Sequence, residues 1–277
     1  MNTLILNKTN ATAQANTFQY NFIGSGYEIK PGSKIAISSI TIPYSWFNVT
    51  KNTNTRIEII WTNIATPYVF TLDPGFYTVN DIQYFLELKM QTLGLYLKDP
   101  SGNYVYYFKM VYNVVYYSVQ ILLYPVPTSL PAGYTAPTNW AGYASPDPQC
   151  PQFTIPTTNS IGSIIGFSAG TYGSTGLNGQ LKQSLLSNLV PIGSSINSVI
   201  VRATICDNPV VSPTDILDSF PITSSFGENI NYVPNTMKFI RAKPGRYSNL
   251  IISFFDENLN PLPMRDTNLL ITLLLKE

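Results

Sequence analysis

Apolar and polar residues alternate along several stretches of the chain, with the period of two that is typical of half-buried β-strands. In residues 17–23, for example, Phe18, Tyr20 and Phe22 stand between polar neighbours. Other strands are indicated by apolar runs between Gly, Pro, Asn and Asp, at residues 4–6, 34–47, 56–61, 68–72, 104–127, 195–205, 235–242, 249–256 and 268–276. About ten strands joined by Gly- and Pro-rich turns predict an all-β, antiparallel sandwich or barrel.

The chain ends on one of these runs. Residues 268–276 are almost wholly apolar, and the turn "DENLNPLP" joins them to the run at 249–256. Because the cleanest strand patterns lie in the first and last thirds of the chain, these thirds are expected to pair. We therefore predict that the last strand lies inside a sheet, beside strands from the beginning of the chain. In the run at 104–127 we expect a hairpin that turns near Tyr112 and Asn113.

One segment, "DPGFYTVNDIQYFLELKMQTLGL", has the period of an amphipathic helix. Its apolar face consists of Ile82, Phe85, Leu86 and Met90. Asn80 or Asp81 can cap its first turn, and Gly94 can end it. A single short helix among strands is expected to cover one edge of a sheet.

The middle of the chain is less regular. Residues 128–158 are rich in Pro, Gly, Ala, Ser and Tyr, and they predict a long, ordered surface loop. A short apolar cluster follows at Ile164, Ile165 and Phe167. No linker composition separates a second domain.

Composition narrows the classes of function. The chain has 277 residues, 44% of them hydrophobic and only 11% charged. With 16 basic and 15 acidic residues the net charge is +1, which gives no electrostatic reason for a nucleic-acid partner. No apolar run approaches the length of a membrane span, and the first residues do not have the pattern of a signal peptide. We expect no membrane span and an intracellular, reducing origin.

Candidate chemistry is sparse. The chain has no histidine, which removes Ser/His/Asp and Cys/His catalysis and His-ligated zinc. Cys150 and Cys206 lack the spacing of a metal or redox motif and are expected to be ordinary thiols. We therefore expect no catalytic, cofactor-binding or metal-binding residues and no enzyme activity.

Carboxylates are the remaining candidates, because two of them can hydrolyse a glycosidic bond. Asp256, Glu257 and Asp266 are close in sequence, but they stand in turns beside Asn and Pro. There, Asp favours hydrogen bonds to nearby backbone groups. The same interpretation applies to the other loop aspartates, Asp147, Asp207, Asp215 and Asp218.

Tyrosines are stronger candidates for functional residues than the carboxylates. "YVYYF" and "VVYYSV" crowd aromatic rings onto neighbouring strands, and core packing in alternate positions explains half of them. Contact between subunits is expected for part of the rest, because Tyr buries a large area at low entropic cost. In the long middle loop, Tyr134, Trp140 and Tyr143 are candidates for aromatic contacts on the outer surface.

Several segments resemble one protein family. They are "PGSKIAISSITIPYSWFNV", "LDPGFYTVNDIQYFL", "LYPVPTSLPAGYTAPTNWAGY", "GFSAGTYG" and "SFGENINYVPNTMKFIRAKPGRYSNLIISFFDENLNPLPMRDTNLLITLLL". The strand, helix and loop patterns of these segments resemble those of the minor capsid, or penton, proteins of virophages and Polinton-like viruses. The resemblance touches most of the chain, and its motifs are structural rather than catalytic.

The resemblance implies a single jelly roll formed by residues 1–95 and 195–277, with 96–194 inserted as a β-rich and loop-rich outer region. It implies a homopentamer at the five-fold vertices of an icosahedral capsid, surrounded by major capsid proteins built from double jelly rolls. It also implies a location in the virion after synthesis in the host cytoplasm.

Two other functions stay open. A carbohydrate-binding β-sandwich for attachment to a host surface would use Tyr134, Trp140 and Tyr143 to stack on sugars. A glycoside-active enzyme would use loop carboxylates. We rank the capsid protein first, the carbohydrate-binding module second and the enzyme third.

Overall fold

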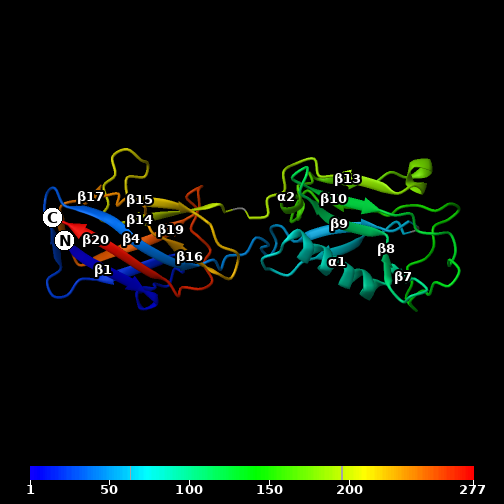
Figure 1. Cartoon of the computed structure of the whole chain (residues 1–277), viewed down its shortest axis with the longest axis horizontal. Helices are drawn as coiled ribbons and strands as arrows, with labels where there is room; N and C mark the ends of the chain where they lie inside the picture. Colours follow the sequence, from blue (N-terminus) through cyan, green and yellow to red (C-terminus); the bar gives the residue numbers. More distant parts are fainter. Residues whose placement is uncertain (63, 195) are drawn as a thin grey trace. The chain divides into compact units, whose positions relative to one another are not determined.

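The computed structural model describes residues 1–62, 64–194 and 196–277 (Figure 1). It divides into two compact units, of which the first joins Met1–Trp46 to Ile196–Glu277 and the second is Phe47–Ser195. Asn63, between two expected strands, and Ser195, where a strand was expected to begin, lie outside the described residues.

The expected division at residues 95 and 96 falls inside the second unit. Residues 47–95 belong to that unit because their strands find partners there. Strand β5 (Arg56–Ile60) pairs with β6 (Tyr68–Thr71) on one side and with β11 (Gln152–Ile155) on the other. The pairing of β5 with β11 joins segments about a hundred residues apart.

The first unit is built mainly from a five-stranded and a four-stranded antiparallel sheet. One has the order β1 (Asn2–Asn7), β20 (Leu270–Lys276), β4 (Lys34–Pro43), β16 (Asn229–Tyr232), with β17 (Ile240–Arg241) also paired to β4. The other has the order β15 (Ile216–Pro221), β14 (Ser198–Ala203), β19 (Asn249–Phe255), β2 (Thr17–Asn21). Smaller elements are the pair β3 (Tyr27–Ile29) with β18 (Gly245–Tyr247) and a 3-10 turn at Lys8–Asn10.

This strand order is that of a jelly roll. Eight strands of the unit, taken in chain order, are β1, β2, β4, β14, β15, β16, β19 and β20. One sheet contains the first, eighth, third and sixth of them, and the other contains the second, seventh, fourth and fifth. The second unit enters between the third and fourth strands. The prediction of an all-β, antiparallel jelly roll with one short helix is confirmed, since α1 (Val79–Leu93) is the one α-helix of more than a single turn in the described residues.

The last strand is an inner strand, as the sequence predicted. Strand β20 pairs with β1 on one side and β4 on the other, so its backbone groups are paired along both edges (Figure 1). Leu273 is opposite Leu4 in β1 and Ile37 in β4, and it is fully buried. Ile271 and Leu275 point the same way, because side chains two residues apart share a face of the sheet.

The β15–β16 edge of the sandwich is tied by polar and aromatic contacts. The Tyr232 ring of β16 stacks on Phe220 of β15, with centroids 4.8 Å apart. Its hydroxyl donates to Asp218 at 2.7 Å, and the Lys238 ammonium lies 2.9 Å from the same carboxylate. These contacts join the two sheets where no strand ladder connects them.

In the second unit, a four-stranded and a three-stranded sheet enclose one apolar core. The four-stranded order is β12 (Gly170–Tyr172), β11, β5, β6, and the three-stranded order is β13 (Gln183–Leu186), β10 (Ser118–Leu123), β9 (Phe108–Asn113). Phe108 and Phe153 meet edge to face, 5.8 Å apart, between the sheets. The remaining elements are β7 (Tyr96–Lys98) paired with β8 (Tyr104–Tyr106), a one-turn helix α2 (Gly162–Ile165) and a 3-10 turn at Gly176–Gln180.

Helix α1 (Val79–Leu93) covers β9, one of the two edge strands of the three-stranded sheet. The side-chain amide oxygen of the buried Gln83 accepts a 2.7 Å hydrogen bond from the backbone N–H of Met110, which belongs to the edge strand β9. Gly94 ends the helix at φ 71°, as expected. The predicted cap was wrong: Thr78 caps the helix in a capping box with Asp81, because a cap bonds the residue three positions on.

Two further details differ from the prediction. The β9–β10 hairpin turns at residues 114–117, two residues beyond the expected turn, because Asn113 pairs with Ser118 and so still belongs to the ladder. Of the strand expected at 235–242, only β17 forms.

Candidate functional site

We first sought catalytic or metal-binding groups. In the described parts of the chain, no three or more Cys, Asp and Glu side chains gather where they could hold a metal ion. Both thiols are buried and donate to backbone carbonyls, Cys150 to Leu181 at 3.2 Å and Cys206 to Ile216 at 3.4 Å. Burial raises the pKa of the Cys150 thiol to about 11 and that of Cys206 to about 12, so both are protonated at neutral pH.

Of the three C-terminal carboxylates, Asp256 and Asp266 form local turn bonds, as predicted, and Glu257 does not. Asp256 accepts from the backbone N–H groups of Asn258 and Asn260, at 2.9 and 2.8 Å. Asp266 accepts from the N–H of Asn268 at 2.8 Å. Glu257 accepts hydrogen bonds from the 197–198 backbone.

The turn interpretation was wrong for Asp207 and Asp215, which form ion pairs instead, whereas Asp218 forms an ion pair and also accepts from the backbone N–H of Ser219 at 2.9 Å. Asp207 pairs with Arg241, and Asp218 pairs with Lys238. Asp215 pairs with Arg202. Sequence reasoning missed these pairs because the partners of Asp207 and Asp218 are 20 or more residues away.

Two surfaces and one pocket remain as candidate sites. The first surface, here the aliphatic face, is the outer side of the sheet β1–β20–β4–β16. Its residues are Thr3, Ile5, Asn7, Lys34, Ala36, Ser39, Thr41, Pro43, Asn229, Asn231, Leu270, Thr272, Leu274 and Lys276. Ile5 is 53% exposed and Leu270 46% exposed. None of these four strands contains an Asp or Glu, so this face has no negative charge of its own.

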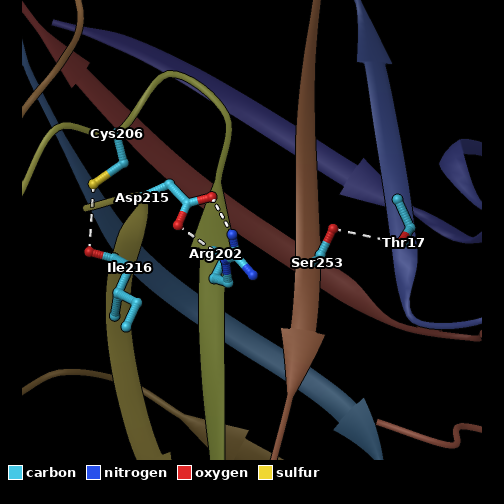
Figure 2. Close-up of polar contacts among 6 residues, drawn as sticks. All are labelled: Thr17, Arg202, Cys206, Asp215, Ile216 and Ser253. Carbon is cyan, nitrogen blue, oxygen red and sulfur yellow. Dashed lines mark hydrogen bonds and ion pairs between the residues drawn. The ribbon is translucent and has the colours of Figure 1, made fainter. Parts of the chain in front are cut away.

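The second surface, here the arginine face, is the outer side of β14, β19 and β2. Its residues are Thr17, Gln19, Ile200, Arg202, Ile251, Ser253 and Phe255. Figure 2 shows its central row, in which Arg202 lies opposite Ser253 and Ser253 opposite Thr17. The Thr17 and Ser253 hydroxyl oxygens are 3.4 Å apart.

The charge on the arginine face is internally neutralised. Arg202 donates two parallel hydrogen bonds to Asp215, from Nε at 2.9 Å and from Nη2 at 2.8 Å (Figure 2). The guanidinium also lies 4.8 Å from the centre of the Phe255 ring. Because Asp215 and the Phe255 ring both hold the guanidinium, its orientation is fixed. The face therefore presents an ion pair rather than a mobile cation.

The pocket lies in the second unit, between helix α1, the β8–β9 segment and the loop that follows β10. It has a volume of about 650 Å³. We call it the tyrosine pocket, after Tyr104, Tyr106, Tyr107, Tyr124 and Tyr134 in its wall. Pro125, Pro127 and Pro131 complete the loop side, and Glu87 and Lys109 are its charged residues.

The structure brings the three predicted aromatic residues around one buried ring, that of Tyr107. Tyr134 lines the pocket directly. Trp140 is half-buried, 5.6 Å from the Trp61 ring and 6.3 Å from that of Tyr107. Tyr143 packs on Trp140 at 5.4 Å. Burial, with smaller contributions from Tyr134 and Tyr143, raises the pKa of the Tyr107 phenol well above its usual value.

Other pocket tyrosines were noticed only as strand residues. Tyr104 and Tyr106 stand two positions apart on β8 and share one face, their rings nearly parallel at 6° with centroids 6.0 Å apart. Their spacing of two residues on a strand was the feature of the sequence that could have indicated that the two rings share a face. Tyr124 is held beside this segment by a 2.9 Å hydrogen bond from its backbone N–H to the carbonyl of Tyr107, the residue after Tyr106.

The fold and these surfaces define the class of the chain: an eight-stranded jelly roll that carries a second, aromatic-rich unit between its third and fourth strands. No protein-family model matches the sequence, and no curated protein is significantly similar to it. The solved structures that match this chain include the following two. The mavirus penton protein is 10% identical over 99% of this chain and 97% of its own, with a TM-score of 0.45. A chain of the Sputnik virophage, solved by cryo-EM, has the same identity and coverages and a TM-score of 0.40.

No helix in the described residues is long and apolar enough to cross a membrane.

Proposed function

We propose that this chain is a structural protein of a virion, in which five copies form the capsomer at each five-fold vertex of an icosahedral capsid. The observation that carries the proposal is the pair of surfaces on the jelly roll. A closed ring of identical subunits needs two different contact surfaces on each subunit. The aliphatic and arginine faces are two such surfaces, on the outer sides of the two opposed sheets.

Their chemistry suits burial. Interface cores are depleted of charged residues, and the aliphatic face carries charge only at one end, at Lys34 and Lys276. On the arginine face, the charge of Arg202 is already paired, so covering it leaves no charge without a partner. Each square ångström of apolar surface removed from water contributes roughly 25 cal/mol before the costs of association.

The remaining parts of the proposal extend the same assembly. Residues 47–195 form the outer region, and major capsid proteins with double jelly rolls surround the ring. The resemblance of the closing strands to those of virophage and Polinton-like penton proteins supports this arrangement. A structural role also accords with carboxylates that are used in turns and ion pairs.

The test compares two variants by sedimentation velocity. Ile5→Lys combined with Leu270→Lys places two charges on the aliphatic face, where both side chains are already exposed and the fold tolerates them. Ile23→Lys is the matched control, because Ile23 is 95% exposed and lies outside both faces. We expect the double variant to lose the pentamer and the control to keep it. An assembly unaffected by the double variant would exclude the aliphatic face as a ring contact.

A further inference from the structure

We propose that the tyrosine pocket binds a neutral oligosaccharide, with the rings of Tyr104 and Tyr134 against the apolar faces of the sugar. This inference does not depend on the vertex assignment, because every residue that lines the pocket belongs to the second unit.

The size and position of the pocket suit a ligand of several sugar rings. Its volume of about 650 Å³ lies within the usual range for ligand pockets, about 300–1,000 Å³. It opens at the surface, where Tyr104 is 45% exposed. An exposed ring face beside half-buried rings offers the platform on which the C–H face of a pyranose can stack.

The polar groups of the pocket match sugar hydroxyls in kind. Five phenols line it, and each phenol is both a donor and an acceptor of hydrogen bonds. Phenols are protonated at neutral pH and can donate, and burial raises the pKa of Tyr106 and Tyr107 still further above neutrality. A sugar hydroxyl is likewise donor and acceptor, so it can use both capacities.

A proline-rich peptide is the main competitor, because such peptides dock in grooves lined by aromatic rings. Its prolines offer carbonyl acceptors but no N–H groups. Such a peptide can only accept hydrogen bonds from the phenols, whereas a sugar hydroxyl can both accept from them and donate to them. The pairing of phenols with hydroxyls is what favours the oligosaccharide.

The charges of the pocket favour a neutral sugar. Glu87 and Lys109 are its only charged lining residues, one of each sign. Glu87 already accepts a 2.7 Å hydrogen bond from the Gln83 amide. The ammonium groups of Lys98 and Lys182 are already engaged with the Tyr104 and Tyr124 rings. A sialylated or sulfated sugar would therefore meet Lys109 as the lining cation, with Glu87 in the same lining.

The wall is held in place before any ligand arrives. Gln91 donates to the Tyr106 hydroxyl, and the ammonium of Lys98 lies 4.9 Å from the centre of the Tyr104 ring. Lys182 lies at the same distance from the Tyr124 ring. Three prolines stiffen the loop side. A preformed site loses less conformational entropy on binding, which favours measurable affinity for a weakly held ligand class.

Trp140 and Tyr143 then act behind the pocket rather than in it. Trp140 packs near the buried Tyr107 ring, and Tyr143 packs on Trp140. Of the three aromatic residues expected to contact a ligand, only Tyr134 would touch the sugar, and the other two position Tyr107.

The experiment measures binding of defined probes to the full chain by saturation-transfer NMR and calorimetry. The probes are neutral trisaccharides of glucose, mannose, galactose and N-acetylglucosamine, a sialylated trisaccharide and a proline decapeptide. Tyr104→Ala and Tyr134→Ala remove a ring each, and Tyr104→Phe removes only a hydroxyl. Tyr84→Ala is the matched control, because Tyr84 is a 64% exposed residue of α1 outside the pocket.

We expect saturable binding of at least one neutral trisaccharide. Either ring deletion should weaken it by about tenfold or more, and Tyr104→Phe by about three- to tenfold. The control should bind as the native chain does, and thermal melts should show that all variants fold. Three results would each overturn the proposal: no neutral trisaccharide binds, the ring deletions bind as well as the control, or only the decapeptide or the sialylated sugar binds.

Discussion

Replacing Leu273 by Ala tests whether the C-terminal strand is the centre of the jelly roll. Leu273 is fully buried in β20, between Leu4 of β1 and Ile37 of β4. The substitution removes three carbon atoms, each worth roughly 0.8 kcal/mol of transfer free energy. A cavity adds to this loss, so the first unit should be destabilised by about 2–5 kcal/mol. Ladders on both sides of β20 keep the site from collapsing, which favours the upper half of that range.

Thr272→Ala is the matched control for this substitution. Thr272 is the neighbouring residue of the same strand, but it lies half-exposed on the aliphatic face. A surface change of this kind is expected to alter the free energy of unfolding by less than about 0.5 kcal/mol.

Amide hydrogen exchange, resolved by peptide, is the suitable assay. A chain of two compact units need not unfold in one transition, so a single melting temperature would mix them. Leu273→Ala should speed exchange in peptides from β4, β19 and β20 and leave β9 and β10 unchanged. Equal acceleration in both units, or an equal effect of Thr272→Ala, would refute the account of the core.

Three other predictions concern polar and titrating groups. Gln83→Met should destabilise the packing of α1 on β9 by about 1–3 kcal/mol, seen as faster exchange in both elements, because a buried backbone N–H loses its acceptor. Burial, together with the hydrogen bond to Asp218, raises the pKa of Tyr232 from 10.0 to about 12. The folded state then keeps a proton that the unfolded chain loses, so this stability is complete below pH 10 and is lost as the pH rises to about 12. Tyr232→Phe should make the free energy of unfolding, measured by denaturant titration at several pH values, fall less steeply with pH over that window. An unchanged slope would contradict the assignment. Cys150 and Cys206 should react with an aromatic disulfide reagent only after denaturation, and rapid reaction of the native chain would show that they are not buried.

The sequence predicted those parts of the fold that depend on local pattern. Alternation of apolar residues identified β2, because a half-buried strand must alternate, and apolar runs between turn residues identified β4, β19 and β20. The cap of α1 was misplaced because Thr78, Asn80 and Asp81 are all capping residues, and only the hydrogen bond to the third residue on distinguishes them.

Long-range pairing could not be predicted from local pattern. The composition of β5 is equally suited to either unit, and its place is decided by β11, about a hundred residues away. The same reason hid the pocket: Tyr104 and Tyr124 were recognised as strand residues, but their convergence with Tyr134 depends on the path of a loop. Tyr134 was found because an aromatic residue in a Pro- and Gly-rich loop has no strand to explain it.

The mass of the native chain in solution tests the central claim most directly. Native mass spectrometry, supported by negative-stain images, counts the copies in each particle. Our account predicts closed rings of five, held together by the outer faces of the two sheets. A chain that stays monomeric at the highest attainable concentration, or rings of another number, would contradict it.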